Sequence, residues 1–155
     1  MINLAGRKRV FLKPGEFFWG TSEYVVSTVL GSCVSICLWH PEKKVGGISH
    51  YRMPGRRKKK RNKLNPDYGD DSMWLLMEKV MENDTKPEEY IVKVFGGARM
   101  FDDDSQIGRA NAEVAIERLT SNGFKVSVKN VGGKKSRKVL FDLKTGDVWL
   151  RDVLF

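Results

Sequence analysis

Two runs of β-forming residues, 33–39 and 45–53, flank a short turn-forming segment. Valine, isoleucine and aromatic residues recur in these runs, which favours two strands. Between them, His40-Pro41-Glu42-Lys43 suits a type I turn, because proline at its second position already holds the backbone angle that the turn needs. The pattern predicts an antiparallel hairpin in which Trp39 lies opposite Lys44. In the same register, Cys33 lies opposite His50.

This register would place a thiol beside an imidazole. Directly opposed residues share a face of the sheet and have Cβ atoms about 5 Å apart. A thiol is mostly protonated at neutral pH, whereas a thiolate beside an imidazolium is stabilised and nucleophilic. Cys33 is therefore a candidate nucleophile and His50 a candidate proton carrier. Gly31 and Ser32 leave little bulk over the sulfur and free backbone N–H groups for an oxyanion.

Two other interpretations of these residues exist. Cys33 and Cys37 could be small core residues and His50 a buried strand histidine. A metal site would use Cys33, Cys37, His40 and His50. Four residues along a strand separate the two cysteines by about 13 Å, which is too far for one tetrahedral zinc ion or for a disulfide. No metal and no cofactor is therefore expected.

Length and composition favour a single domain over residues 1–155. A chain of 155 residues with 41% hydrophobic content is long enough for one well-packed core and short for two. The sequence has no apolar run of membrane-spanning length and no secretory signal pattern at its start. Membrane insertion is not expected, and the two cysteines agree with a reducing, cytoplasmic location.

Much of the formal charge of +9 is concentrated in one segment without apolar residues, which predicts a mobile basic loop at about 55–66. Because it begins soon after His50, this loop could steer an acidic partner toward the thiol. It could equally be a solvated loop that aids solubility. No aromatic residues interleave with it, so a nucleic acid partner is not expected. Its basic residues are Arg56, Arg57, Lys58, Lys59, Lys60, Arg61 and Lys63.

The remaining sequence predicts an α/β protein with many strands and two helices. One helix follows Asp70-Asp71-Ser72, and a second spans about 106–122 and ends at Gly123. The second helix should pack on the sheet through Ile107, Ala110, Val114 and Ala115. Further strands are predicted at 9–12, 16–19, 24–30, 90–95, 124–131, 138–142 and 147–152.

Several blocks of the sequence resemble those of the CheD family of chemoreceptor glutamine deamidases. They occur in the family's order over nearly the whole chain, which makes the resemblance specific. The blocks are Thr28-Val29-Leu30-Gly31-Ser32-Cys33-Val34, Gly46-Gly47-Ile48-Ser49-His50-Tyr51-Arg52-Met53-Pro54, Lys93-Val94-Phe95-Gly96-Gly97-Ala98-Arg99-Met100, Ile107-Gly108-Arg109-Ala110-Asn111, Val131-Gly132-Gly133 and Ser136-Arg137-Lys138-Val139-Leu140-Phe141.

The resemblance implies hydrolysis of glutamine side-chain amides on the cytoplasmic signalling helices of chemoreceptors. It implies a triad in which Cys33 is the nucleophile, His50 the base and Thr28 the third member. Ser27 is the alternative third member, because the spacing between this hydroxyl and the cysteine varies by one residue in the family. The implied fold is an α/β/β sandwich, with two packed sheets and helices on one flank.

The resemblance leaves partners and docking surfaces open. Some family members bind a CheC-type phosphatase, which is therefore a possible partner. Candidate docking residues are the basic loop and the segment Phe95, Gly96 and Gly97, although a glycine pair alone indicates only a tight turn. Two other functions remain as alternatives, a non-catalytic adaptor and a basic nucleic-acid-binding domain.

Overall fold

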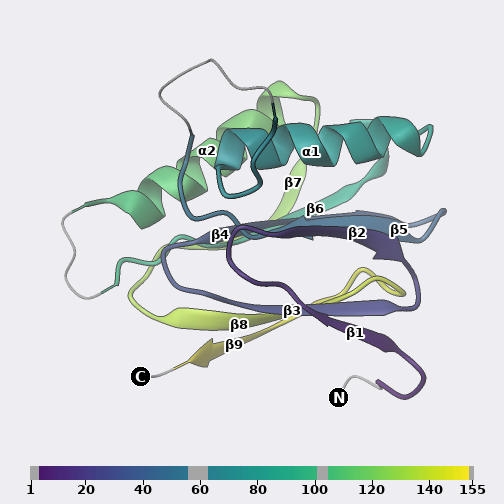
Figure 1. Cartoon of the computed structure of the whole chain (residues 1–155), viewed down its shortest axis with the longest axis horizontal. Helices are drawn as coiled ribbons and strands as arrows, with labels where there is room; N and C mark the ends of the chain where they lie inside the picture. Colours follow the sequence, from purple (N-terminus) through teal and green to yellow (C-terminus); the bar gives the residue numbers. More distant parts are fainter. Residues whose placement is uncertain (1–3, 56–62, 101–104, 154–155) are drawn as a thin grey trace.

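A computed structural model describes residues 4–55, 63–100 and 105–153, and these segments form two stacked β-sheets with two α-helices above one of them (Figure 1). The predicted α/β/β sandwich is confirmed. The four-stranded sheet has the order β1 (Lys8–Phe11), β3 (Tyr24–Leu30), β8 (Ser136–Asp142) and β9 (Val148–Val153). The five-stranded sheet has the order β2 (Phe17–Thr21), β5 (Val45–Ser49), β4 (Val34–His40), β6 (Ile91–Gly96) and β7 (Val126–Val131).

The helices α1 (Gly69–Glu82) and α2 (Ile107–Ser121) cover the outer face of the five-stranded sheet (Figure 1). A short 3₁₀ helix, η1 (Pro87–Glu89), precedes β6. Neither described helix has the length and apolar character that crossing a membrane requires.

The five-stranded sheet separates two apolar cores. One core joins α1 and α2 to the sheet, and the other fills the space between the two sheets. β4 lies at the middle of the five-stranded sheet, so every one of its residues is buried. Its side chains alternate between the cores, with Ile36 and Leu38 toward the helices and Cys37 and Trp39 toward the other sheet. The hairpin that carries the candidate site is thus covered on both faces.

The hairpin forms, but its predicted register is wrong. His40 pairs with Val45 and Trp39 with Gly46, so the four-residue loop runs from Pro41 to Lys44. Lys44 takes a left-handed backbone conformation with φ 52°, and its N–H donates to the carbonyl of His40 at 2.8 Å. The whole pairing is therefore shifted by two residues from the predicted one. A shift of two leaves every side chain on the face that was predicted, whereas a shift of one would have exchanged the faces.

The predicted helix at 106–122 is confirmed as α2, but its packing face is rotated from the predicted one. Ile107, Ala110 and Val114 are only half-buried. The buried residues are Gly108, Asn111, Ala112, Ala115 and Leu119. The difference arises because small and polar residues, which an apolar pattern does not include, form part of the buried face. The approach of α2 to the sheet is close at Gly108, where a Cβ atom would lie 2.3 Å from the carbonyl oxygen of Ala98.

Candidate active site

His50 follows β5 and is held from the other sheet by Thr28 of β3. The Oγ1 atom of Thr28 lies 2.6 Å from Nδ1 of His50 and donates to the carbonyl of Leu12 at 2.7 Å. A hydroxyl has one proton, so Thr28 must accept the hydrogen bond from the imidazole. The proton of neutral His50 therefore resides on Nδ1, and Nε2 presents a lone pair.

The lone pair on Nε2 accepts no hydrogen bond from the residues that the structure describes. The Nε2 atom of His50 is buried and has no hydrogen-bond partner among the residues that the structure describes. Buried polar atoms usually have a hydrogen-bond partner. An imidazole nitrogen without one is typical of a general base in an active site.

Cys33 lies on the same face of the hairpin as His50. It stands one residue before β4, in the loop that follows β3. Val34 and Tyr51 form a bridge between the two segments, and both side chains pack toward the helices. Cys33 and His50, each one residue before a member of that bridge, therefore face the other sheet, in diagonal positions. Diagonal neighbours have separations of about 7–8 Å, within reach of a longer side chain such as histidine.

The backbone carbonyl groups of the loop around Cys33 all accept hydrogen bonds. The carbonyl of Gly31 accepts from the N–H of Ala98 at 3.0 Å, and that of Cys33 accepts from the N–H of Gly97 at 2.9 Å. The carbonyl of Ser32 accepts from the side chain of Asn111. Neither the Ser32 nor the Cys33 N–H donates to another residue of the described chain. These two N–H groups are therefore available to a bound oxygen.

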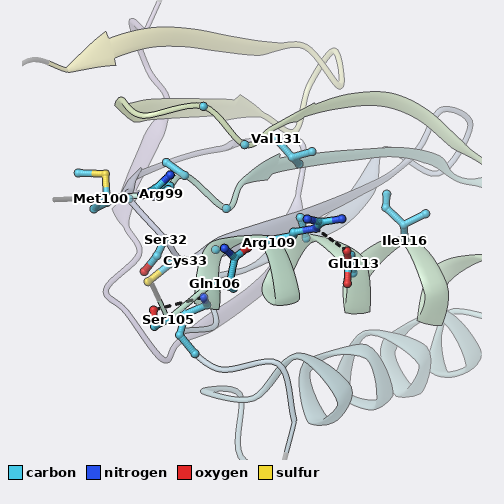
Figure 2. Close-up of a pocket in the computed structure, with 18 of the residues that line it drawn as sticks. Ser32, Cys33, Arg99, Met100, Ser105, Gln106, Arg109, Glu113, Ile116 and Val131 are labelled. Atoms are coloured by element: carbon cyan, nitrogen blue, oxygen red, sulfur yellow. Dashed lines mark hydrogen bonds and ion pairs between the residues drawn. The ribbon is translucent and has the colours of Figure 1, made fainter. Parts of the chain in front are cut away.

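Cys33 lines a pocket of about 1250 Å³ between the loops at the strand ends and α2. In Figure 2, Ser32 and Cys33 lie at one end of this pocket, while Arg109, Glu113 and Ile116 follow α2 toward the other. Gly31 and Gly97 also line it. Cys33 is half-buried in the wall of this pocket, while His50 lies beneath the surface at 1% exposure.

Burial sets the protonation state of both groups. Burial raises the pKa of the Cys33 thiol, against the opposing effect of the Arg52 cation. Burial also lowers the pKa of His50 from 6.5 to about 4. At neutral pH the resting pair is therefore a neutral thiol and a neutral imidazole, and not the thiolate beside an imidazolium that the sequence suggested.

Arg52 and Asp67 are charged neighbours that sequence reasoning did not single out. They form an ion pair in which Nη2 of Arg52 lies 2.6 Å from Oδ2 of Asp67. The carboxylate raises the pKa values of both Cys33 and His50, and the guanidinium lowers them. Arg52 could have been found from its position two residues after His50. Asp67 could not have been found from the sequence, because no pattern between the two residues predicts that the chain brings Asp67 back to Arg52.

The other predicted residues are distributed over several environments. Ser27 does not reach His50, because neighbouring strand residues point to opposite faces and Thr28 occupies the inner one. Phe95 is buried between the sheets at 2% exposure, so its side chain is not available for docking, and Gly96 is not among the pocket residues. The basic residues Arg56 to Arg61 lie outside the described part of the chain.

The four residues of the conceivable metal site are spread along the hairpin. Cys37 is in the core, where burial raises its pKa, and His40 pairs through Nε2 with Glu89 at 2.9 Å. Within residues 4–55, 63–100 and 105–153, no three His, Cys, Asp or Glu side chains are grouped to hold a metal ion.

We expect the buried imidazole to make the protein acid-sensitive. His50 has a folded-state pKa of about 4, below its unfolded value of 6.5, so the unfolded chain binds the additional proton between these pH values. Stability is retained above pH 6.5 and lost as the pH falls toward 4, by roughly 3 kcal/mol from this residue. Urea denaturation at about pH 7 and pH 4 measures the loss. The His50→Gln variant should lose about 3 kcal/mol less than the wild type; equal losses would contradict the assignment.

Comparison with known proteins supports one family. The family model described as CheD chemotactic sensory transduction matches residues 53–152. A protein of Dechloromonas aromatica named probable chemoreceptor glutamine deamidase CheD 3 is 41% identical over 145 residues, covering 91% of this chain and 85% of its own length. The probable chemoreceptor glutamine deamidase CheD of Pseudomonas syringae pv. syringae is 35% identical over 152 residues, covering 94% and 85%.

A third relative is also similar over most of its length. The probable chemoreceptor glutamine deamidase CheD 1 of Leptospira interrogans is 34% identical over 153 residues, covering 91% of this chain and 90% of its own length. Thr28, Cys33 and His50 precede the segment that the family model matches, whereas these pairwise similarities extend over more than nine-tenths of the chain. Together with the α/β/β sandwich, they show that the chain belongs to the CheD family.

Proposed function

We propose that this protein hydrolyses glutamine side-chain amides of chemoreceptors to glutamate and ammonia in bacterial chemotaxis. The names of the relatives give the substrate and the reaction. The observation that carries the chemistry is the hydrogen bond from His50 Nδ1 to Thr28, because it leaves Nε2 as a base on the face of the hairpin that carries Cys33. The receptor's signalling helices lie in the cytoplasm, where the protein would act.

The first half of the reaction forms a thioester. Nε2 of His50 accepts the thiol proton as the sulfur of Cys33 attacks the amide carbon. The amide oxygen becomes an oxyanion, which the N–H groups of Ser32 and Cys33 stabilise. When the tetrahedral intermediate collapses, the imidazolium gives its proton to the departing nitrogen, which leaves as ammonia.

The second half restores the enzyme. Nε2 takes a proton from a water molecule, whose oxygen attacks the thioester carbon. The oxyanion forms again at the same N–H groups. Its collapse expels the sulfur of Cys33, which recovers its proton from His50, and glutamate is released. A neutral starting pair suits this cycle, because His50 must be unprotonated at the start of each half-reaction.

The test is a deamidation assay. The purified protein is incubated with a receptor signalling fragment that carries glutamines, and released ammonia is measured together with the mass change at each glutamine. Ammonia in proportion to the converted glutamines supports the proposal. Tight binding of the fragment without ammonia release would instead favour the adaptor, and association with a CheC-type phosphatase remains a separate prediction.

Thr28 is expected to be the third member of the triad. Thr28→Val keeps the shape of the side chain but removes the acceptor that fixes the imidazole tautomer, so kcat should fall roughly 100-fold. Ser27→Ala is the matched control, because it removes a hydroxyl from the other face of the same strand. It should retain wild-type kcat in the same ammonia assay. The reverse ranking of the two variants would assign the role to Ser27.

A further inference from the structure

Asn111 connects the two segments that carry Cys33 and His50. Its side chain is fully buried on α2, and Nδ2 donates to the carbonyl of Ser32 at 3.0 Å and to that of Arg52 at 2.9 Å. Both partners are acceptors, so the atom between them must be the amide nitrogen. One side chain thus binds the residue directly before Cys33 and the residue two positions after His50.

The backbone geometry around α2 allows this contact and fixes it. A Cβ atom at Gly108 would lie 2.3 Å from the carbonyl oxygen of Ala98, so only glycine lets the helix start so close to the loop. Asn111 follows three residues later, on the same face of the helix. In addition, the hydroxyl of Tyr51 donates to the backbone carbonyl of Asn111 at 2.5 Å. The amide is therefore held at both its side chain and its backbone.

Anchoring the carbonyl of Ser32 also orients the next N–H group. In a trans peptide the C=O of Ser32 and the N–H of Cys33 point in opposite directions. Because Asn111 holds that carbonyl, it also fixes the direction of the N–H of Cys33. The same side chain, through Arg52, restrains the segment that continues from His50.

We propose that Asn111 is a positioning residue that sets the distance between the Cys33 thiol and the His50 imidazole. The inference rests on the proposed function, because a fixed distance matters only if a proton passes between these groups. Proton transfer and attack depend steeply on geometry, so a displacement of about 1 Å can cost about 100-fold in rate. Asn111→Ala releases both carbonyls and should lower kcat about 10- to 100-fold with little change in KM.

The decisive readout needs no receptor. In a coupled neutral pair, the minor form with a thiolate and an imidazolium has a population independent of pH between the two pKa values. Alkylation of Cys33 by iodoacetamide, followed by mass spectrometry, should therefore show a plateau in the wild type at pH values just above the His50 pKa of about 4, where this form outnumbers the free thiolate. In His50→Gln, only the free thiolate reacts, so the rate should rise about tenfold per pH unit below the thiol pKa. Asn111→Ala should show this sloping profile.

Two further variants keep the result unambiguous. Asn122→Ala removes an amide from the end of the same helix, where Nδ2 donates to the carbonyl of Arg118, and should retain the plateau. Asn111→Ser keeps one donor and should show a reduced plateau. Circular dichroism establishes that each variant is folded. If neither Asn111 variant folds, the residue serves the fold alone and the proposal is overturned.

The outcomes separate this inference from the proposed function. A plateau that survives in folded Asn111→Ala overturns the positioning role and leaves the coupling of Cys33 with His50 intact. A wild type without a plateau overturns both, because there is no coupled pair to position. A wild type with a plateau but no ammonia release rejects the receptor as substrate, while the comparison of variants still decides the role of Asn111.

Discussion

Cys33→Ser is expected to lower the rate of ammonia release by at least about 1000-fold. A serine hydroxyl is far less acidic than a thiol, and its activation requires a base that holds a proton firmly. His50, whose pKa burial lowers to about 4, is a weak base. It can assist a thiol, which gives up its proton readily, but not an alcohol. Ammonia release from the receptor fragment measures the loss.

Cys37 provides the matched control. It lies four residues further along the hairpin, is buried in the core between the sheets and does not line the pocket. Cys37→Ala should retain wild-type kcat while the small cavity lowers the free energy of unfolding by about 1 kcal/mol. Equal ammonia release by the wild type and Cys33→Ser would reject the thiol mechanism.

His50→Gln is expected to lower kcat about 1000-fold, within the range of a lost general acid–base group. Glutamine can still donate toward Thr28, so the variant removes the base with limited disturbance of the site. The remaining activity should depend on the free thiolate alone. Its rate should rise about tenfold per pH unit below the thiol pKa, whereas the wild-type rate should be nearly constant from about pH 5 to 8 because His50 is unprotonated there.

Ammonia release measured across this pH range tests the assignment. A variant whose profile parallels that of the wild type would show that another group accepts the thiol proton. An acid limb near pH 6.5 in the wild type, rather than near 4, would contradict the effect of burial on the imidazole.

The sequence predicts the face that Cys33 and His50 share more reliably than the register of their hairpin. Strand alternation has a period of two, so the face survives a two-residue error in register. The error arose at the turn, where Lys44 takes a left-handed conformation that favours glycine and asparagine. Nothing in a lysine signals that conformation, so the loop could not be placed from turn preferences alone.

The choice between Ser27 and Thr28 was undecidable from the pattern of β3. Val26 and Leu30 share a face with Thr28, and Val25 and Val29 share the other with Ser27. Both faces of β3 carry apolar residues, so the alternation of side chains along the strand does not indicate which face packs against the second sheet. Only the packing of the two sheets selects the inner hydroxyl.

Asn111 was missed for a different reason. A search for an apolar stripe passes over a polar residue on a buried helix face, although burial there requires that the residue be hydrogen-bonded. Its partners are backbone carbonyls, which every sequence offers equally. Hydrogen bonds from a side chain to the backbone therefore cannot be predicted from the residue types of the partners.

The bond between Thr28 and His50 crosses from one sheet to the other. Each sheet keeps its own ladder of hydrogen bonds if the layers slide, but the imidazole would lose the acceptor that fixes its tautomer once Thr28 Oγ1 moved beyond hydrogen-bonding distance. Substitutions that displace one sheet against the other are therefore expected to lower kcat before they unfold the protein, whereas Cys37→Ala, which leaves the sheets in place, is not. A variant with an unchanged melting temperature can therefore still lack activity if its two sheets are displaced.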